Sequence, residues 1–282
     1  MSRPMRTILV VANETLGGPH LLQRLREEAA AGPIRVVICV PRQRPHHGTL
    51  IYDETVFDAA QVRIDFARGV LRELGIDAIG EVGDPEPFSA AMDAIAEHHP
   101  DHIIISTFPA ASSGWLRRNF VEQIEAAVDV PVEHIVTDPV VEKAPFHTTL
   151  VVANRTASGD RLIDELRAPR AEPSDGRRRA LIFVVPIEGG EPIAVRRARA
   201  RLDQVVDRAR AAGFVAAGMT GDPDPFTATL NALDLFYVDD IVISTYPETR
   251  SGWLRADLVE RVRKASRRPV QHVVAESREA PA

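Results

Sequence analysis

The sequence predicts an α/β protein built as two tandem copies of one unit, each a parallel β-sheet with helices on both faces. The first observation is an internal repeat: residues 83–136 match residues 221–274 without gaps at 25 of 54 positions, 138 residues apart. The segments 9–13 and 150–154 are also identical, at a spacing of 141 residues. The second observation is that apolar, β-branched runs alternate with amphipathic stretches, which is typical of a parallel sheet with helical crossovers.

Each copy is expected to form one complete domain. We place the first domain at residues 1–138 and the second at residues 147–276, joined by the proline-punctuated linker 139–146 and followed by the tail 277–282. The full length of 282 residues is sufficient for two domains of this size.

Continuous apolar runs predict five buried parallel strands in each copy. In the first copy they are residues 8–12, 35–40, 78–82, 102–106 and 132–136. In the second copy they are residues 150–153, 181–185, 215–219, 240–244 and 271–274.

Apolar residues at helical spacing predict the helices between these strands. In the first copy the helices are expected at residues 20–31, 56–74, 87–98 and 119–128. Gly32-Pro33 ends the first of them, and Gly75 ends the second. The two copies differ mainly in the loops around the second strand, where insertions are best tolerated.

Composition and charge argue against several classes of function. The net charge is −6, divided into −8 for residues 1–145 and +2 for residues 146–282, so we expect no nucleic-acid partner. The basic clusters 177–179, 196–197 and 267–268 are interpreted as solvated surface charge. No apolar run approaches the ~18 residues of a membrane span. The single Cys39 is expected in the core of a strand, and a chain that cannot form an internal disulfide fits the cytoplasm.

Polar residues shared by both copies follow the predicted strands, and they are the candidate ligand-binding residues. In a parallel α/β sheet, ligands bind outside the carboxyl ends of the strands, at the switch point in strand order. The candidates of the first copy are Asn13, Thr15, Gly83, Asp84, Ser106, Thr107, Ser113, Trp115, Arg117 and Asn119. Those of the second copy are Asn154, Thr156, Gly221, Asp222, Ser244, Thr245, Ser251, Trp253, Arg255 and Asp257.

Each candidate also has a structural interpretation. Residues 83–87 form a tight turn and helix start in which glycine permits unusual backbone angles, Glu86 caps, and Pro87 takes the first helical position. Asn119 and Asp257 have capping-box spacing to a glutamate and are interpreted as N-caps. Trp115 and Trp253 are either apolar anchors of their loop or stacking surfaces for a ring. Arg117 either binds a phosphate or carboxylate together with Ser106-Thr107, or pairs with Asp84.

These residues resemble the universal stress protein family in its tandem two-domain form. The resemblance rests on the opening strand ILVVAN, the long second helix ending in LGI or AGF, the GDP turn, the strand IIIST and the closing VPVEHIV, and it covers nearly the whole chain. It implies a doubly wound, Rossmann-like sheet of order 3-2-1-4-5 in each copy, pairing through the last strands, and a stress-associated or regulatory role. The partner of each copy is then either the other copy or a second chain in a homodimer.

The resemblance also implies an adenine nucleotide as ligand, but two departures make ATP doubtful. In nucleotide-binding members the segment after the fourth strand resembles Gly-x2-Gly-x9-Gly-Ser/Thr, whereas residues 106–119 lack both early glycines and carry the rigid Pro109. The Asp usual after the first strand is Asn13 or Asn154 here. The chain therefore looks like a divergent branch with its own small anionic or nucleotide-like ligand, or with none.

No catalytic or metal-binding constellation emerges from the motifs. Gly-x-Ser-x-Gly, Walker A and Gly-x-Gly-x-x-Gly patterns are absent from the sequence. His46-His47 with Asp53 and Glu54 is interpreted as an exposed loop. His98, His99 and His102 surround a predicted helix end, where cations are favoured without a metal. His134 and His272 recur in the fifth strand and are expected to find local hydrogen bonds.

Three hypotheses of function remain. The first is a non-catalytic tandem module that binds a small ligand at the strand ends. The second is a protein-interaction scaffold with vestigial clefts, which the missing glycines favour. The third is a weak nucleotide hydrolase, for which only Asp84 and Asp222 could supply a base or metal ligands.

Overall fold

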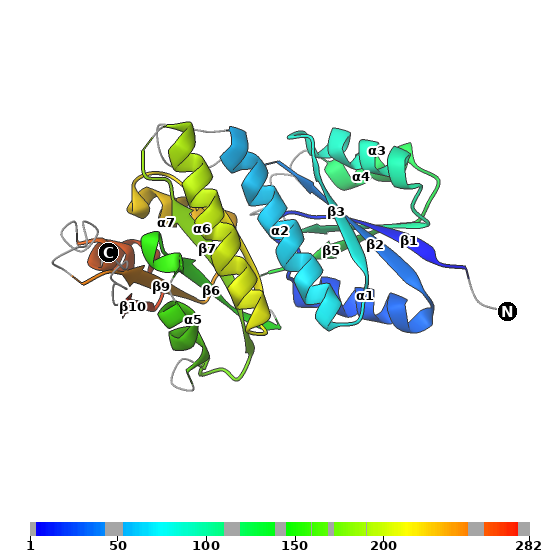
Figure 1. The fold of residues 1–282 in the computed structure, drawn as a ribbon. Coiled ribbons are helices and arrows are strands. Elements are labelled where there is room, and N and C mark those ends of the chain that lie inside the picture. The colour runs from blue at the N-terminus through cyan, green and yellow to red at the C-terminus, as the bar shows by residue number, and fades with distance from the viewer. Residues whose placement is uncertain are drawn as a thin grey trace. The chain divides into compact units, whose positions relative to one another are not determined.

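The chain folds into two five-stranded parallel sheets, each covered by helices (Figure 1). The computed structural model describes residues 4–42, 53–109, 119–138, 145–158, 160–168, 172–189, 191–247 and 257–275. The chain divides into two compact units: the first contains residues 1–44 and 56–145, and the second contains residues 45–55 and 146–282. Unit 1 contains the first sheet and unit 2 the second. Most of the expected linker and all of the expected tail lie outside the described residues.

Unit 1 has the sheet order β3-β2-β1-β4-β5, with every neighbouring pair parallel. Its strands are β1 (Arg6–Val11), β2 (Ile34–Pro41), β3 (Ala78–Gly83), β4 (His102–Thr107) and β5 (Val132–Val136). Its helices are α1 (Pro19–Ala31), α2 (Asp53–Glu73), α3 (Pro87–His98) and α4 (Phe120–Ala127).

Unit 2 repeats this topology with the order β8-β7-β6-β9-β10. Its strands are β6 (Phe146–Val152), β7 (Arg178–Pro186), β8 (Val215–Gly221), β9 (Asp240–Thr245) and β10 (Val270–Val274). Its helical segments are η2 (Arg155–Ser158), α5 (Asp160–Arg167), α6 (Pro192–Ala211), α7 (Pro225–Leu235) and α9 (Leu258–Ser266). The predicted fold class, the number of strands and their order are confirmed.

The core of each unit lies between the sheet and the helices on its faces. In unit 1, Leu9 and Ile105 of the central strands pack with Ala94 of α3 and Ile124 of α4. Cys39 belongs to the same cluster, where burial, together with the charges of Glu81 and Asp93, raises the pKa of its thiol to about 12. The interpretation of Cys39 as a buried core residue is therefore confirmed.

Strand β6 begins four residues earlier than its apolar run predicts. Phe146, Thr148 and Thr149 are buried although two of them are polar. The backbone N–H of Thr148 donates to Asp239 Oδ2 at 2.8 Å, and Thr7 makes the same bond to Asp101 in unit 1 at 2.7 Å. Hydrogen bonding to an aspartate that directly precedes the neighbouring strand thus extends both first strands beyond their apolar residues.

The amino ends of the strands in unit 2 are joined by a partly buried ion-pair network. Arg177 donates to Asp175 Oδ2 at 2.6 Å, to Asp239 Oδ1 at 2.7 Å and to the carbonyl oxygen of Phe146 at 2.8 Å. Arg179 lies 3.4 Å from Asp240, and its side chain is only 7% exposed. The interpretation of residues 177–179 as solvated charge is therefore wrong for Arg177 and Arg179, because tertiary structure brings carboxylates to both.

In unit 1 the amino ends carry a related but different network. Arg24 contacts Glu28 and Glu133, and Arg6 reaches Glu28 at 2.5 Å. Burial raises the pKa of Glu28, but the hydrogen bonds from the two arginines outweigh it and lower the pKa overall. A hollow of about 520 Å³ beside Arg6 and Glu28 is lined also by Pro4, Ala31, Gly32 and Pro33.

Acidification is expected to destabilise unit 2 through Asp175. Burial acts to raise the pKa of Asp175, but hydrogen bonds from Arg177 and His147 and the charge of Arg177 outweigh it and hold the pKa well below its usual range. A depressed carboxyl pKa gives stability that is present above the unfolded-state pKa of about 3.9 and is lost as the pH falls through the folded-state pKa. We expect Asp175→Asn to lose less stability than the parent between about pH 5 and pH 2. Hydrogen exchange in β6 and β7 measures this, and equal acid sensitivity of the two proteins would contradict the prediction.

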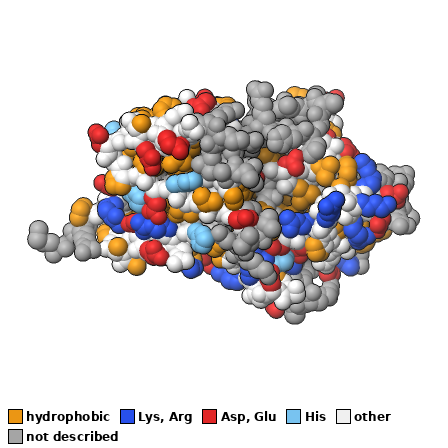
Figure 2. All heavy atoms as spheres, turned by 180° about the vertical axis from the view of Figure 1, so that it is seen from behind, with side chains coloured by type: hydrophobic (Ala, Val, Ile, Leu, Met, Phe, Trp, Pro, Cys, Tyr) orange, Lys and Arg blue, Asp and Glu red, His pale blue; other side chains and the backbone are white. Residues whose placement is uncertain are grey.

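One face of the described residues carries charges of both signs (Figure 2). On the face shown in Figure 2, Lys and Arg side chains lie among Asp, Glu and His side chains of the described residues. In the part of the chain that the structure describes, no helix is long and apolar enough to cross a membrane.

Candidate functional site

The candidate site of each unit lies at the carboxyl ends of its two central strands. In unit 1 the chain adds β2 and β3 on one side of β1, and β4 and β5 on the other. The switch point in strand order therefore falls between β1 and β4, where parallel α/β sheets bind ligands. Asn13 and Thr15 follow β1 there, and Ser106 and Thr107 end β4.

A threonine hydroxyl bridges the two strand ends in both units. Thr15 Oγ1 donates to the carbonyl oxygen of Ser106 at 2.9 Å, and Thr156 Oγ1 donates to that of Ser244 at 3.1 Å. Both threonines are less than 5% exposed. The structure thus brings together the predicted residues of the first and fourth strands, and it uses these two hydroxyls to hold the strand ends in place.

A second hydroxyl at each strand end bonds a histidine of the edge strand. Thr107 Oγ1 lies 2.9 Å from His134 Nε2, and Thr245 Oγ1 lies 2.8 Å from His272 Nε2. Each threonine also donates to the carbonyl oxygen of the next residue at 2.9 Å. Because the single hydroxyl proton is used there, each histidine Nε2 is the donor to its threonine. Burial lowers the pKa of His134, against the charges of Glu122 and Glu125, which favours the neutral ring. The local hydrogen bonds expected for both histidines are confirmed.

In both units the serine directly before the strand-end threonine has a buried hydroxyl without a hydrogen-bond partner among the described residues. Ser106 and Ser244 are each 1% exposed, and among the described residues neither Oγ has a hydrogen-bond partner. A buried hydroxyl without a partner costs about 1–3 kcal/mol. The same cost at the same place in both units marks the strand-end serine as a residue of this site with unused bonding capacity.

Two arginines at this end of the sheets, of which Arg63 is buried and Arg201 is partly buried, were not predicted from the sequence. In unit 2, Arg201 of α6 donates to Asn154 Oδ1 at 2.6 Å, and Asn154 is 8% exposed. The equivalent residue of α2, 138 positions earlier, is Arg63, which is 4% exposed. Burial lowers the pKa of Arg63 to about 10, against the charge of Glu14, so its guanidinium remains cationic at neutral pH. The identity of the two residues at equivalent positions of the repeat is the signal in the sequence that could have indicated them.

Gly83 and Gly221 have a packing role and do not adopt the unusual backbone angles that were expected. Neither glycine has a positive φ. A Cβ on Gly83 would lie 2.5 Å from Ala90 Cβ, and one on Gly221 would lie 2.8 Å from Ala228 Cβ. Glycine is needed here because the next helix approaches the strand closely.

The aspartates after these glycines complete the helix starts. Asp84 Oδ1 accepts from the backbone N–H of Glu86 at 2.8 Å, and Glu86 Oε2 accepts from that of Ser89 at 2.7 Å. The capping role of Glu86 is confirmed, with Pro87 as the first helical residue. Asp222 bonds the N–H of Asp224 at 2.9 Å in the same way.

Asn119 and Asp257 stand at the N-cap positions of α4 and α9, but neither side chain makes a capping hydrogen bond. The prediction that both residues are N-caps is therefore confirmed for their position, but the side-chain hydrogen bond of a capping box is not made. Both residues have left-handed backbone angles, with φ of 51° and 48°. Asn and Asp tolerate this conformation better than other non-glycine residues, which explains their use before the last helix.

The remaining predicted candidates lie outside the described residues. They are Ser113, Trp115, Arg117, Ser251, Trp253 and Arg255. His46 and His47 also lie outside them.

Fold and candidate site together define a tandem, doubly wound α/β protein with polar residues at the switch point of each sheet. No family model matches the sequence, and no curated protein matches it. Solved structures do match, including a universal stress protein from Archaeoglobus fulgidus DSM 4304 with 16% identity and a TM-score of 0.34, over 95% of this chain and 96% of that one. A protein from Pseudomonas aeruginosa UCBPP-PA14, described under the same family name, has 16% identity and a TM-score of 0.32 over 95% and 93%.

A functionally unknown protein from Pseudomonas aeruginosa PAO1 has 17% identity and a TM-score of 0.30, over 95% of this chain and 92% of that one. These matches are similar to the chain along nearly its whole length. The fold itself is established by the strand order, which is the order that the family resemblance implies.

Proposed function

We propose that this protein is a non-catalytic, tandem universal-stress-protein-like module that binds a small anionic or nucleotide-like ligand at the carboxyl ends of the central strands. The observation that carries the proposal is the buried strand-end serine in both units. The hydroxyls of Ser106 and Ser244 have no partner among the described residues. A ligand oxygen at the switch point would accept from such a hydroxyl and remove the cost of its burial.

Charge supports an anionic ligand. Arg63 keeps a buried positive charge in α2, and Arg201, which also lies 3.6 Å from Glu188, donates to Asn154 just after β6. A cation in a partly desolvated position attracts an anion more strongly than one in water. The non-catalytic part of the proposal is supported by the use of Asp84 and Asp222 as acceptors of backbone N–H groups within their own turns.

A second candidate is a protein-interaction scaffold with vestigial clefts. It is favoured by the internal bonds of Thr15, Thr107 and their equivalents, which leave these hydroxyls less available to a ligand. The scaffold needs no small molecule, so ligand-dependent stability distinguishes it from the first proposal.

Thermal melting of the full chain against ATP, AMP and inorganic phosphate tests the proposal. We expect a saturable rise in melting temperature with at least one of these probes, because a ligand at 100 times its Kd stabilises the folded state by about 2.7 kcal/mol. The double variant Ser106→Ala, Ser244→Ala is expected to weaken or abolish that rise. The control Ser89→Ala, an exposed serine of α3, is expected to keep it. Flat melting curves for the parent with all probes would contradict ligand binding and leave the scaffold.

A further inference from the structure

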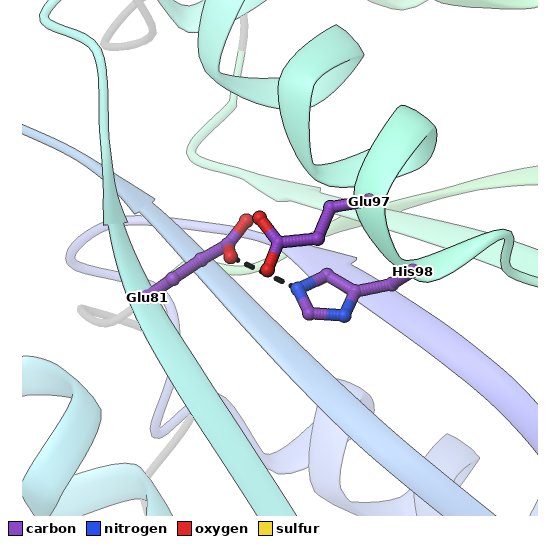
Figure 3. Close-up of side chains that lie close together, drawn as sticks. All are labelled: Glu81, Glu97 and His98. Carbon is purple, nitrogen blue, oxygen red and sulfur yellow. Dashed lines mark hydrogen bonds and ion pairs between the residues drawn. The ribbon is translucent and has the colours of Figure 1, made fainter.

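Unit 1 contains a cluster of three metal-ligating side chains away from the strand-end site. Glu81 of β3 and Glu97 and His98 of the last turn of α3 place one carboxylate oxygen or imidazole nitrogen each within 4.8 Å of the others. Figure 3 shows the three side chains pointing toward one another from the strand and the helix. His98 Nε2 lies 2.9 Å from Glu81 Oε2. The sequence did not predict this cluster, because Glu81 is separated from the two helical residues along the chain.

The donor set suits a divalent transition-metal ion. One imidazole nitrogen and two carboxylate oxygens are ligands that Zn²⁺ accepts, at about 2.0–2.2 Å from each donor. Donors around a tetrahedral ion at that distance lie about 3.4 Å apart, so closing the cluster requires only small side-chain rotations. Glu97 is exposed and can make them, while His98 and Glu81 are 18% and 30% exposed and open to entry of an ion from solvent.

Charge also favours a cation at this place. Two carboxylates carry two negative charges beside one imidazole, and the carbonyl groups at the end of α3 add the negative end of the helix dipole. Asp93, one turn earlier on α3, is a further negative charge, and together with Glu81 it acts to raise the pKa of the Cys39 thiol. A divalent ion bound to Glu81, Glu97 and neutral His98 would balance the charge of its three ligands.

The second copy shows what the same positions do without polar ligands. The residues 138 positions later are Met219, Leu235 and Phe236, which are 2%, 2% and 7% exposed. All three ligating residues of unit 1 thus correspond to buried apolar residues of unit 2. In unit 2, buried apolar side chains lie where α7 meets β8. In unit 1, potential metal ligands lie at the matching place, where α3 meets β3.

A second group of potential ligands in the described residues behaves differently. His147, Asp175 and Asp239 also lie within 4.8 Å of one another. Arg177 already pairs with both of these aspartates, at 2.6 and 2.7 Å. Its guanidinium supplies the positive charge there, so the argument for a metal ion applies to the Glu81 cluster alone.

We propose that Glu81, Glu97 and His98 form a binding site for a divalent transition-metal ion such as Zn²⁺. The ion connects the last turn of α3 to the edge strand β3, and it stabilises unit 1 where unit 2 uses apolar contacts. The site is separate from the proposed ligand site, because its residues lie on the α3 side of β3 and none belongs to the ends of β1 or β4.

Titration of the metal-stripped full chain with ZnCl₂ tests the site, with binding followed by calorimetry and by hydrogen exchange in β3 and α3. We expect the parent to bind one Zn²⁺ that slows exchange in these elements. The double variant Glu81→Gln, His98→Gln is expected to weaken this binding by roughly 10-fold or more, since even residues behind a metal ligand cost 10–100-fold. The control His99→Asn removes the adjacent exposed imidazole and keeps a residue that tolerates the left-handed angles of that position, with φ of 45°, so its Zn²⁺ binding should equal that of the parent.

A second variant, which carries the residues of the second copy, tests the site even if the glutamine variant does not fold. Glu81→Met, Glu97→Leu, His98→Phe introduces side chains that occupy the matching positions of unit 2. We expect it to lose Zn²⁺ binding and to be as stable without the ion as the parent is with it. Zn²⁺ binding of equal affinity and stoichiometry in the parent and in this variant would overturn the proposal, as would a parent that binds no Zn²⁺.

Discussion

Arg177→Gln is expected to lower the free energy of unfolding of unit 2 by about 2 kcal/mol, because hydrogen bonds that involve charged groups contribute about 1.5–3 kcal/mol and this partly buried arginine makes several of them. The arginine side chain is 13% exposed and serves two carboxylates and a backbone carbonyl. Glutamine is too short to reach all three acceptors. Denaturant unfolding, followed by hydrogen exchange in β6, β7 and β9, gives the measurement.

Arg196→Gln provides the control for this variant. Arg196 is an exposed residue of α6 in the same unit, and its replacement is expected to change stability by no more than about 0.5 kcal/mol. A loss of similar size in both variants would show that the network does not contribute the expected stability.

Gly218→Ala and Gly80→Ala are expected to destabilise units 2 and 1 by about 2–3 kcal/mol each, because an added methyl group in a packed core forces shifts of side chains or backbone. The two glycines occupy the same position of β8 and β3. A Cβ on Gly218 would lie 2.5 Å from Leu202 Cδ1 and 2.9 Å from the carbonyl oxygen of Phe183. A Cβ on Gly80 would lie 2.2 Å from Ile64 Cγ2, and Ile64 is fully buried.

Gly17→Ala is the matched control for the glycine variants. A Cβ on Gly17 would meet nothing within 4 Å, and this glycine has no positive φ. Its replacement should leave stability within about 0.5 kcal/mol of the parent. Tolerance of alanine at both Gly80 and Gly218 would mean that α2 and α6 can move away from their sheets at little cost.

The fold was predictable because its signals are local or repeated. Apolar β-branched runs located the ten strands, and the bounds of α3 and β5 agree with the expected ranges. Differences arise where tertiary bonds extend an element, as at Thr148 with Asp239. The packing role of Gly83 was also not predicted, because the close approach of Ala90 is a contact between two elements and leaves no local pattern in the sequence.

The location of the candidate site was predictable from the sequence, but the role of each of its side chains was not. Residues at the ends of β1 and β4 do meet, since parallel strands bring their carboxyl ends to one edge. Which hydroxyls are used internally could not be predicted, because Thr15 bonds a backbone carbonyl 91 residues away. Arg63 and Arg201 were also not predicted. An arginine on an amphipathic helix usually faces solvent, and only the packing of α2 and α6 buries Arg63 and brings Arg201 to Asn154.

The sequence by itself determined that this protein is one doubly wound α/β domain present twice, because hydrophobic periodicity and repeat identity are written along the chain. Only the tertiary structure decided which polar side chains are consumed by internal bonds and which keep unused capacity. It left the hydroxyls of Ser106 and Ser244 without partners among the described residues, and it assembled Glu81, Glu97 and His98 into one cluster. The physical reason is that hydrogen bonding and metal ligation depend on ångström-scale distances between elements, which the order of residues alone does not specify.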